Sequence, residues 1–304
     1  MVTNLNRVVV AGGTGLVGRA LVRALIDQGS RVQVLTRSPQ TLHVPAGASA
    51  HGWGELPSLL EGADAVINLA GEGIAEGRWT SSRKNALLCS RIDTTTQLVE
   101  AMGRCVVPPK ALVNASAIGF YIPRGDSPVD EGAAAGSGFL ADVCLAWEKA
   151  ALAANLLGVR VALIRIGVVL ASDGGALPKM ALPVRWCQGC KLGNGKQGLS
   201  WIHLQDLVAM LVAAAGQPAW QGAFNATAPE PLSNEAFTRL LARQLHRPLL
   251  PIPGFLTTLA TKLLLGEMAE ALLLQGAYVL PARAQALGFT FRFPTAEAAL
   301  KDLL

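Results

Sequence analysis

The chain has 304 residues, of which 51% are hydrophobic and 15% are charged, and its formal net charge at pH 7 is +5. This balance excludes a disordered chain, and the length is ample for one large or two ordinary domains with a buried core. The basic residues are scattered and form no runs, so we expect no nucleic-acid partner.

The segment "RVVVAGGTGLVGRALVRALIDQGSRVQVLTRSP" predicts a strand, a glycine turn, a helix and a second strand. Arg7 to Ala11 is a continuous apolar run, as in a strand buried on both faces. Apolar residues then recur at helical spacing from Leu16, and Gly29 stands where a helix C-cap belongs. "RVQVLT" is the next strand. The segment is therefore a βαβ unit of about thirty residues.

The glycine turn "GGTGLVG" fits two spacings, because Gly15 and Gly18 combine with either Gly12 or Gly13. It follows a buried strand and opens an amphipathic helix, which is the context of a dinucleotide-binding turn. Glycines allow the backbone to approach a pyrophosphate, and the helix N-terminus presents N–H groups to it. A P-loop is excluded because no Gly-Lys-Ser/Thr follows. The alternative is a turn that needs glycine for its shape alone.

The end of the second predicted strand indicates which dinucleotide is bound. An acidic residue there would bind the ribose 2′-hydroxyl of NAD. This chain has Thr36 and Arg37 instead, and a guanidinium suits a 2′-phosphate. The sequence therefore predicts NADP(H) as the cofactor. The alternative is that Arg37 is a solvated surface residue.

Strand and helix patterns continue to alternate as far as residue 170, which predicts a parallel sheet with helices on both faces. The predicted strands are "DAVINLAG", "KALVNASAIG" and "VRVALIRIGVVL", and the predicted helices are "WTSSRKNALLCSRIDTTTQLVEAM" and "FLADVCLAWEKAALAANL". The fold class is α/β, a Rossmann-type doubly wound sheet. We expect residues 1–170, with strands contributed from 195–228, to form the cofactor domain. Residues 171–304 would form a smaller, mostly helical substrate lobe.

Two further segments raise the questions of membrane and metal binding. The apolar stretch beginning at Phe255 is interrupted by Lys262 and Glu267, so we expect buried helices and no membrane span. The first residues lack an apolar signal region, and we expect a cytoplasmic protein. Cys187 and Cys190 have redox or half-zinc-site spacing but no second pair. We predict no metal site, and the role of these two cysteines stays open.

Several motifs along nearly the whole chain resemble those of a known family. They are "AGGTGLVG", "INLAGE", "RWT", "ASAIGFY", "FLADVCLAWEKAA", "RIGVVLASDGGALPKM", "GNGKQGLSWIHLQD" and "LGFTFRFP". The chain resembles the epimerase-like family of atypical, extended short-chain dehydrogenases/reductases. Members are often named nucleoside-diphosphate-sugar epimerases, and the last 60 or so residues resemble their short C-terminal domain of unknown function.

The resemblance implies a set of site residues and partners. The cofactor would be held by residues from the turn, the ends of the strands and the neighbouring helix. These are Gly12, Thr14, Gly15, Leu16, Val17, Gly18, Thr36, Arg37, Leu69, Ala70, Gly71, Glu72, Arg91, Ala115, Ser116, Ile166, Gly167 and Val168. Lys196, Gln197 and Trp201 would contact a small-molecule substrate such as a nucleotide sugar. A homodimer through the two long helices is also implied.

Short-chain dehydrogenases carry a Tyr and, four residues later, a Lys on one helix face, where the Tyr transfers a proton and the Lys holds the ribose. This chain has no Tyr-x-x-x-Lys. If Glu148 is aligned with the acidic residue of that helix, the Lys position falls on Cys144 and the Tyr position on Leu140. Cys144 is expected to be a small buried hydrophobe.

Tyr121, Ser116 and His203 are the candidates to replace the missing dyad. Tyr121 follows the strand that would run beside the nicotinamide, Ser116 could polarise an oxygen, and His203 could exchange protons near neutral pH. Each also has a structural interpretation, as a packed ring, a satisfied strand end and a hydrogen-bonded core residue. The loop also departs from the family, since Ile122 stands where members usually carry a Gly.

Three functions therefore remain open. The first is an NADP-dependent oxidoreductase or epimerase with a non-standard proton donor. The second is an NADPH-binding regulator that acts through a protein partner without turnover. The third is an interaction protein with a vestigial turn, which the intact glycines and Arg37 disfavour.

Overall fold

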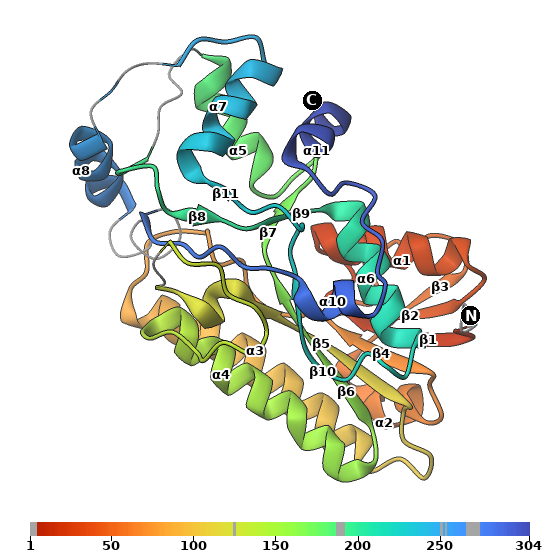
Figure 1. Cartoon of the computed structure of the whole chain (residues 1–304). Coiled ribbons are helices and arrows are strands. Elements are labelled where there is room, and N and C mark those ends of the chain that lie inside the picture. The colour runs from red at the N-terminus through yellow and green to blue at the C-terminus, as the bar shows by residue number, and fades with distance from the viewer. Residues whose placement is uncertain (1–4, 124–125, 187–191, 250–251, 253, 266–273) are drawn as a thin grey trace.

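The computed structural model describes residues 5–123, 126–186, 192–249, 252, 254–265 and 274–304, so Cys187 and Cys190 lie outside the described residues. Seven strands form one parallel sheet in the order β3-β2-β1-β4-β5-β6-β10 (Figure 1). The strands are β1 (Arg7–Ala11), β2 (Arg31–Leu35), β3 (Ala48–His51), β4 (Ala65–Asn68), β5 (Ala111–Ala117), β6 (Arg160–Ile166) and β10 (Gly222–Ala226). The predicted Rossmann-type α/β fold is confirmed.

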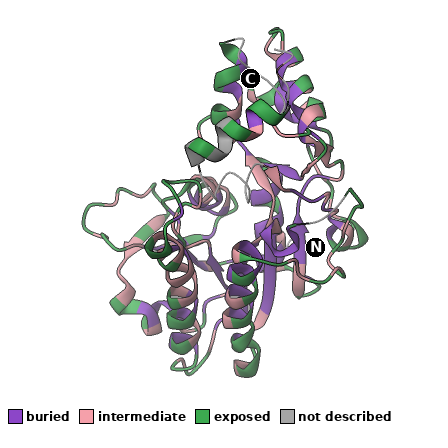
Figure 2. Ribbon diagram, turned by 90° about the vertical axis from the view of Figure 1, so that its left-hand side faces the viewer, coloured by how far each residue is buried: buried purple, intermediate pink, exposed green. Residues whose placement is uncertain are grey.

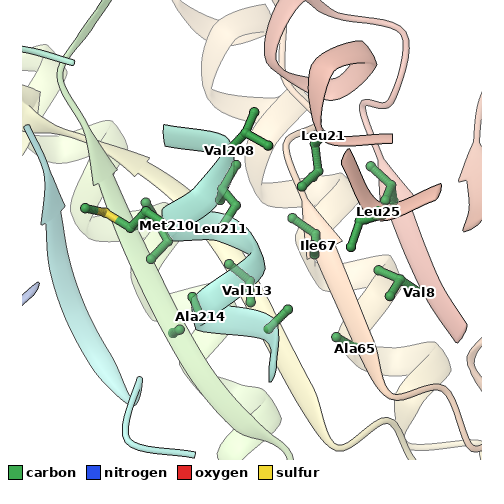
Figure 3. Packing of buried hydrophobic residues seen from close by; sticks show 14 of the residues in the cluster. Val8, Leu21, Leu25, Ala65, Ile67, Val113, Val208, Met210, Leu211 and Ala214 are labelled. Carbon is green, nitrogen blue, oxygen red and sulfur yellow. The ribbon is translucent and has the colours of Figure 1, made fainter. Parts of the chain in front are cut away.

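Helices cover both faces of this sheet. On one face lie α1 (Leu16–Asp27) and α6 (Leu204–Gly216), whose Leu21 and Leu211 pack with Val8 and Ile67 of the sheet (Figure 3). On the other face lie α2 (Leu56–Leu60), α3 (Ser81–Met102) and α4 (Phe139–Leu152). Short 3-10 turns precede α2, follow β5 and follow α4, at η1 (Trp53–Glu55), η2 (Ile118–Tyr121) and η3 (Ala153–Leu157). The central strands are buried between the two helical layers, as Figure 2 shows, whereas the edge strand β3 is only partly buried.

The segment predicted as one strand over 159–170 is divided in the structure. It leaves the sheet at Gly167 and continues as β7 (Val168–Leu170), which pairs with β9 (Trp201–His203). The backbone of Gly167 is enclosed, because its N–H donates to Ala226 O and an added Cβ would lie 2.8 Å from Ser200 O. The break depends on these distant neighbours and has no local sequence pattern.

A second lobe stands beyond the carboxyl ends of the strands (Figure 1). Its core joins α5 (Leu177–Arg185), α7 (Asn234–Gln244) and α11 (Ala296–Leu303) around Trp201 and Phe237. The remaining described elements are β8 (Gly198–Leu199), β11 (Leu232–Ser233), α8 (Gly254–Leu265) and α10 (Ala282–Ala286). The extended chain before α10 ties this lobe to the sheet, since Asn225 Nδ2 donates to Leu280 O and Thr227 Oγ1 to Val279 O.

The described residues contain neither a membrane-spanning helix nor a metal-binding cluster. No described helix combines the length and apolar character that crossing a membrane would need. Among the same residues, no group of three or more His, Cys, Asp or Glu side chains is arranged to hold a metal ion.

Candidate functional site

The turn between β1 and α1 is built by glycines that have no room for a side chain. Gly12 adopts a φ of +80°, and an added Cβ would lie 2.6 Å from the carbonyl carbon of Leu69. The Cβ of an alanine at position 18 would lie 2.2 Å from Gly12 O, and one at position 13 would lie 2.7 Å from Val34. These contacts bring α1 close against the ends of β1, β2 and β4.

Gly15 differs from its neighbours, because the nearest atom to an added Cβ would be Gly12 O at 3.6 Å. Its missing side chain is therefore not required by packing within the chain. Gly15 is also the N-cap of α1, where no side chain caps the helix and no acidic residue occupies the first turn. A helix N-terminus with uncapped N–H groups and open space beside its glycine fits the pyrophosphate of a dinucleotide.

The end of β2 presents a cation and no carboxylate. Arg37 is exposed, directly after the buried Leu35 and the half-buried Thr36. Thr36 shapes the turn, since its N–H donates to His51 O and its Oγ1 accepts from the Ser38 N–H at 3.2 Å. The turn after β2 thus holds Arg37, the residue predicted to bind the 2′-phosphate, at the same edge of the sheet as the Gly12–Gly18 turn.

The segment after β4 is fixed by buried polar groups. Leu69 N–H donates to Ala11 O, and Ala70 N–H donates to the side chain of Asn68, whose amide group in turn donates to Thr95 and Asn114. Leu69 and Ala70 are half-buried, and Gly71 is exposed. These contacts bring the predicted cofactor residues Leu69 to Gly71 against the glycine turn.

Glu72 follows β4, and Arg91 of α3 contacts its backbone. Both are predicted cofactor-binding residues. The Glu72 carboxylate forms an ion pair with Arg83 and not with Arg91. Arg91 donates instead to two backbone carbonyls, from Nη2 to Glu72 O at 3.0 Å and from Nη1 to Leu87 O at 2.9 Å. Burial lowers the pKa of Arg91, and the nearby Glu72 carboxylate partly opposes this lowering.

Apolar and sulfur side chains occupy the positions of the missing dyad. Leu140 and Cys144 are both buried on the inner face of α4. Burial raises the pKa of the Cys144 thiol to about 11, and its Sγ donates to Ala117 O at 3.6 Å. The prediction that Cys144 is a small buried hydrophobe is confirmed.

Two of the catalytic candidates belong to a single buried polar network. Ser116 Oγ donates to Glu148 Oε1 at 2.7 Å, and both Glu148 oxygens accept from Arg165 at 2.8 Å. Arg165 Nη1 donates to the Tyr121 hydroxyl at 2.7 Å, and that hydroxyl donates to Asn225 Oδ1 at 2.9 Å. We call these five residues the Glu148 network.

The polar groups of the Glu148 network are hydrogen-bonded to one another inside the core. Burial raises the pKa of Tyr121, whose side chain is fully enclosed. Burial alone would lower the pKa of Arg165, but its hydrogen bonds to Glu148 raise it above its usual value. The hydrogens of Ser116 and Tyr121 are directed at partners inside the protein, so neither hydroxyl presents a proton to a ligand in this structure.

His203 ends β9, which belongs to the separate two-stranded sheet and not to the seven-stranded one. Its ring is buried at the N-cap of α6, where Nδ1 accepts from the Gln205 N–H at 3.1 Å, and it stacks on Phe293 at 3.8 Å between centroids. Nε2 lies 3.3 Å from Asp302 Oδ2, at an ion-pair distance but outside hydrogen-bond geometry. Burial lowers the pKa of His203. The structure thus places this ring between α6 and α11.

The predicted substrate segment is divided between surface and core. Lys196 is exposed and its carbonyl accepts from the Tyr278 hydroxyl at 2.7 Å. Gln197 is half-buried and its Nε2 donates to Leu192 O. Trp201 is fully buried, and its indole N–H donates to Glu230 O. Lys196 therefore faces solvent, whereas Trp201 packs in the core of the second lobe.

The remaining predicted cofactor residues lie on neighbouring strands. Ala115 is buried near the end of β5, and Ile166, Gly167 and Val168 are half-buried where β6 gives way to β7. The site thus collects residues from β1, β2, β4, β5 and β6 at one edge of the sheet, where ligands of open α/β sheets bind.

Sequence reasoning missed the Glu148 network. A signal for Glu148 was present, because it lies four residues after Cys144 and seven after Ala141 on the buried face of α4. A carboxylate at such a position needs a buried partner. No pattern points to Arg165 or Asn225, which meet Tyr121 across 44 and 104 residues.

Two family models match the chain. The model of the NAD dependent epimerase/dehydratase family matches residues 8–226. A domain of unknown function, DUF1731, matches residues 256–303. Together they span the sheet and the C-terminal helices.

Known proteins are similar over nearly the whole chain. The epimerase family protein SDR39U1 homolog, chloroplastic, of Arabidopsis thaliana is 40% identical, over 97% of this chain and 86% of its own length. The crystal structure of human epimerase family protein SDR39U1 (isoform2) with NADPH is 32% identical, with a TM-score of 0.86 and 98% coverage of each chain. UDP-glucuronic acid 4-epimerase from Bacillus cereus in complex with NAD is 15% identical, with a TM-score of 0.75 over 98% of this chain and 96% of that chain, and shares the fold.

Proposed function

Because the chain belongs to the NAD dependent epimerase/dehydratase family, we propose that it binds NADP(H) in preference to NAD(H) and transforms a small, nucleotide-sugar-like substrate. The pyrophosphate lies over Gly15 at the N-terminus of α1, and Arg37 holds the 2′-phosphate. Leu69 to Gly71 pack along the cofactor. The human relative crystallised with NADPH supports this choice of dinucleotide.

The observation that carries the proposal is the cation at the end of β2. Arg37 is exposed there, and no carboxylate lies between Leu35 and Pro39 to bind a free 2′-hydroxyl. A guanidinium forms strong, charge-assisted hydrogen bonds with a phosphate. The neighbouring Gly15, whose side-chain position is open, allows the rest of the dinucleotide to reach the same edge of the sheet.

The reaction class follows from the family and from the missing dyad. Bound NADPH supplies a hydride for reduction of a carbonyl, and bound NADP⁺ accepts one. The chain binds the cofactor, orients the substrate in the second lobe near Lys196, and moves the proton without a Tyr-x-x-x-Lys pair. Reductase or epimerase activity both fit this arrangement.

A fluorescence titration of the purified protein with NADPH and NADH tests the cofactor. We expect NADH to bind at least about tenfold more weakly, and Arg37→Ala to weaken NADPH about tenfold while leaving NADH unchanged, because one phosphate contact is lost. Arg23→Ala, an exposed cation on α1, is the matched control. Equal affinities for the two nucleotides would refute the preference.

A second candidate function is an NADPH-binding regulator without turnover. It is favoured by one observation, namely that Ser116 and Tyr121 direct their hydrogens into the Glu148 network. The two functions differ in one measurement. Oxidation of bound NADPH, followed by its absorbance against a panel of carbonyl compounds and nucleotide sugars, identifies an enzyme. Binding with neither oxidation of NADPH by any compound nor epimerisation of any nucleotide sugar by the NADP⁺ complex supports the regulator.

A further inference from the structure

The cation Arg91 lies beside the helix position from which the dyad lysine is missing. It comes from α3, which packs along α4, and its guanidinium carbon is 5.2 Å from the centroid of the Trp147 ring. Trp147 follows Cys144, the lysine position, by three residues on the same helix face. The charge of Arg91 also acts on the Cys144 thiol. Arg91 therefore brings a positive charge next to the place that the lysine would occupy.

The guanidinium of Arg91 is aimed at the end of β4. Its bonds to Glu72 O and Leu87 O use two of its five N–H groups. A Cβ on Gly71 would lie only 3.2 Å from its Cγ and Cζ, so the absence of a side chain at this position lets Arg91 reach the strand ends. Donor groups thus remain for an acceptor beside the Leu69–Gly71 segment.

The charge of Arg91 has no acidic partner in the described part of the chain. Glu72, the residue whose carboxylate acts on Arg91, pairs with Arg83 instead. Arg91 is half-buried, and burial lowers its pKa without bringing it near neutrality, since an arginine stays protonated in proteins. A partly desolvated cation bound only to carbonyls is an incomplete site, and ligand oxygens would complete it.

We propose that Arg91 takes over the ribose-binding role of the missing lysine, donating hydrogen bonds to the hydroxyls of the nicotinamide-side ribose of NADP(H). The proposal rests on the proposed function. Arg91 reaches this ribose from α3, whereas the lysine would reach it from α4. The positive charge would thus act at the same ribose from a different helix.

Fragments of the cofactor distinguish binding of the nicotinamide-side ribose from a general effect of Arg91 on cofactor affinity. NADPH and 2′-phospho-ADP-ribose both contain the second ribose, whereas 2′,5′-ADP lacks it but still carries the phosphate for Arg37. Calorimetric titration of Arg91→Met should show about tenfold weaker binding of the first two ligands and a change below about twofold for 2′,5′-ADP. Arg37→Ala should weaken all three.

Three further variants keep the test decisive. Arg91→Lys retains the charge and should recover part of the affinity for NADPH. Gly71→Ala should weaken NADPH without removing a charge, because its Cβ displaces the guanidinium. Arg104→Met, which removes an exposed cation just after α3, should change nothing.

The possible failures can be told apart. Unchanged NADPH affinity in Arg91→Met alone would overturn the role of Arg91, because Gly71 itself lies against the proposed cofactor site. Equal weakening of all three ligands by Arg91→Met, together with a changed circular dichroism spectrum, would assign it to the fold instead. If the unaltered protein binds neither NADPH nor 2′,5′-ADP, the proposed function itself fails.

Discussion

The turn at Gly12–Gly18 and the Glu148 network both stand at the carboxyl ends of the strands, yet they are built in opposite ways. The turn is made of backbone, with open space beside Gly15 and a helix N-terminus that no side chain caps. The network is made of side chains, and its hydroxyls and charges bind one another. The first region leaves donors for a ligand, whereas the second uses its donors to hold the fold.

This contrast explains how the chain can lack the dyad and still keep a cofactor site. In the proposed site the cofactor is bound by the turn, by Arg37 and by the segment after β4, none of which is part of α4. The face of α4 that would carry Tyr and Lys instead buries Leu140, Cys144 and Glu148. Substitutions in the two regions should therefore differ in their effects on stability and on cofactor binding.

The largest effect is expected from breaking the buried ion pair of the network. Glu148→Gln leaves the charge of Arg165 buried and uncompensated, which should lower the free energy of unfolding by about 3–5 kcal/mol. Urea unfolding measures this loss. Glu235→Gln, which breaks an exposed ion pair with Arg239, is the control and should cost at most about 1 kcal/mol. Equal losses of unfolding free energy in the two variants would show that the network stabilises the fold no more than an exposed ion pair does.

Two glycines of the turn should respond differently to the same substitution. Gly18→Ala places a Cβ 2.2 Å from Gly12 O and should cost about 3 kcal/mol of stability. Gly15→Ala has room within the chain, so it should cost less than about 1 kcal/mol but weaken NADPH by at least about tenfold. Thermal unfolding and NADPH titration of both variants give the comparison. Unaltered NADPH binding in Gly15→Ala would mean that the open space is not the pyrophosphate site.

Tyr121→Phe tests the assignment of this hydroxyl to the network. Its removal takes an acceptor from Arg165 and a donor from Asn225, which should cost about 1–3 kcal/mol of stability. NADPH affinity should change by less than about twofold. If an active substrate is found, a loss of turnover with unchanged stability and cofactor binding would instead make Tyr121 the proton donor.

The smallest effect concerns His203 and pH. Burial lowers its pKa in the folded chain, while Asp302 and Asp206 raise it and Arg292 lowers it. The unfolded side chain titrates near 6.5, so it binds a proton first as the pH falls. The contribution of His203 to the free energy of unfolding should be fully present above about pH 6.5. It should decline below that pH, by at most about 1.4 kcal/mol per pH unit.

Denaturation at several pH values checks the contribution of His203. His203→Asn can keep the cap of α6 without titrating, and it should flatten the profile below pH 6.5 or so. His43→Asn, on an exposed histidine, should leave the profile unchanged. A profile that is the same in His203→Asn and the unaltered protein would show that another group titrates.

The sequence predicts a structural feature well when the residues that cause it are consecutive in the chain. The β1–α1 turn was predictable because its strand, glycines and helix are consecutive. The short edge strand β3 has only partial burial, and its four residues "ASAH" include no large apolar or β-branched side chain that would mark a strand. Tyr121, Ser116 and His203 carry groups capable of chemistry, but their burial is decided by Asn225, Glu148 and Phe293, far away in the chain. Residue type alone therefore predicted more contact with a ligand than these buried side chains can make in the structure.

The most direct test of the contrast between the two regions is amide hydrogen exchange with and without NADPH. The account predicts slower exchange in the presence of NADPH for peptides covering residues 12–18 and 36–38, and unchanged exchange across residues 145–151 of α4 around Glu148. Unchanged exchange in the glycine turn, with NADPH protecting only α4 and the end of β6, would contradict it.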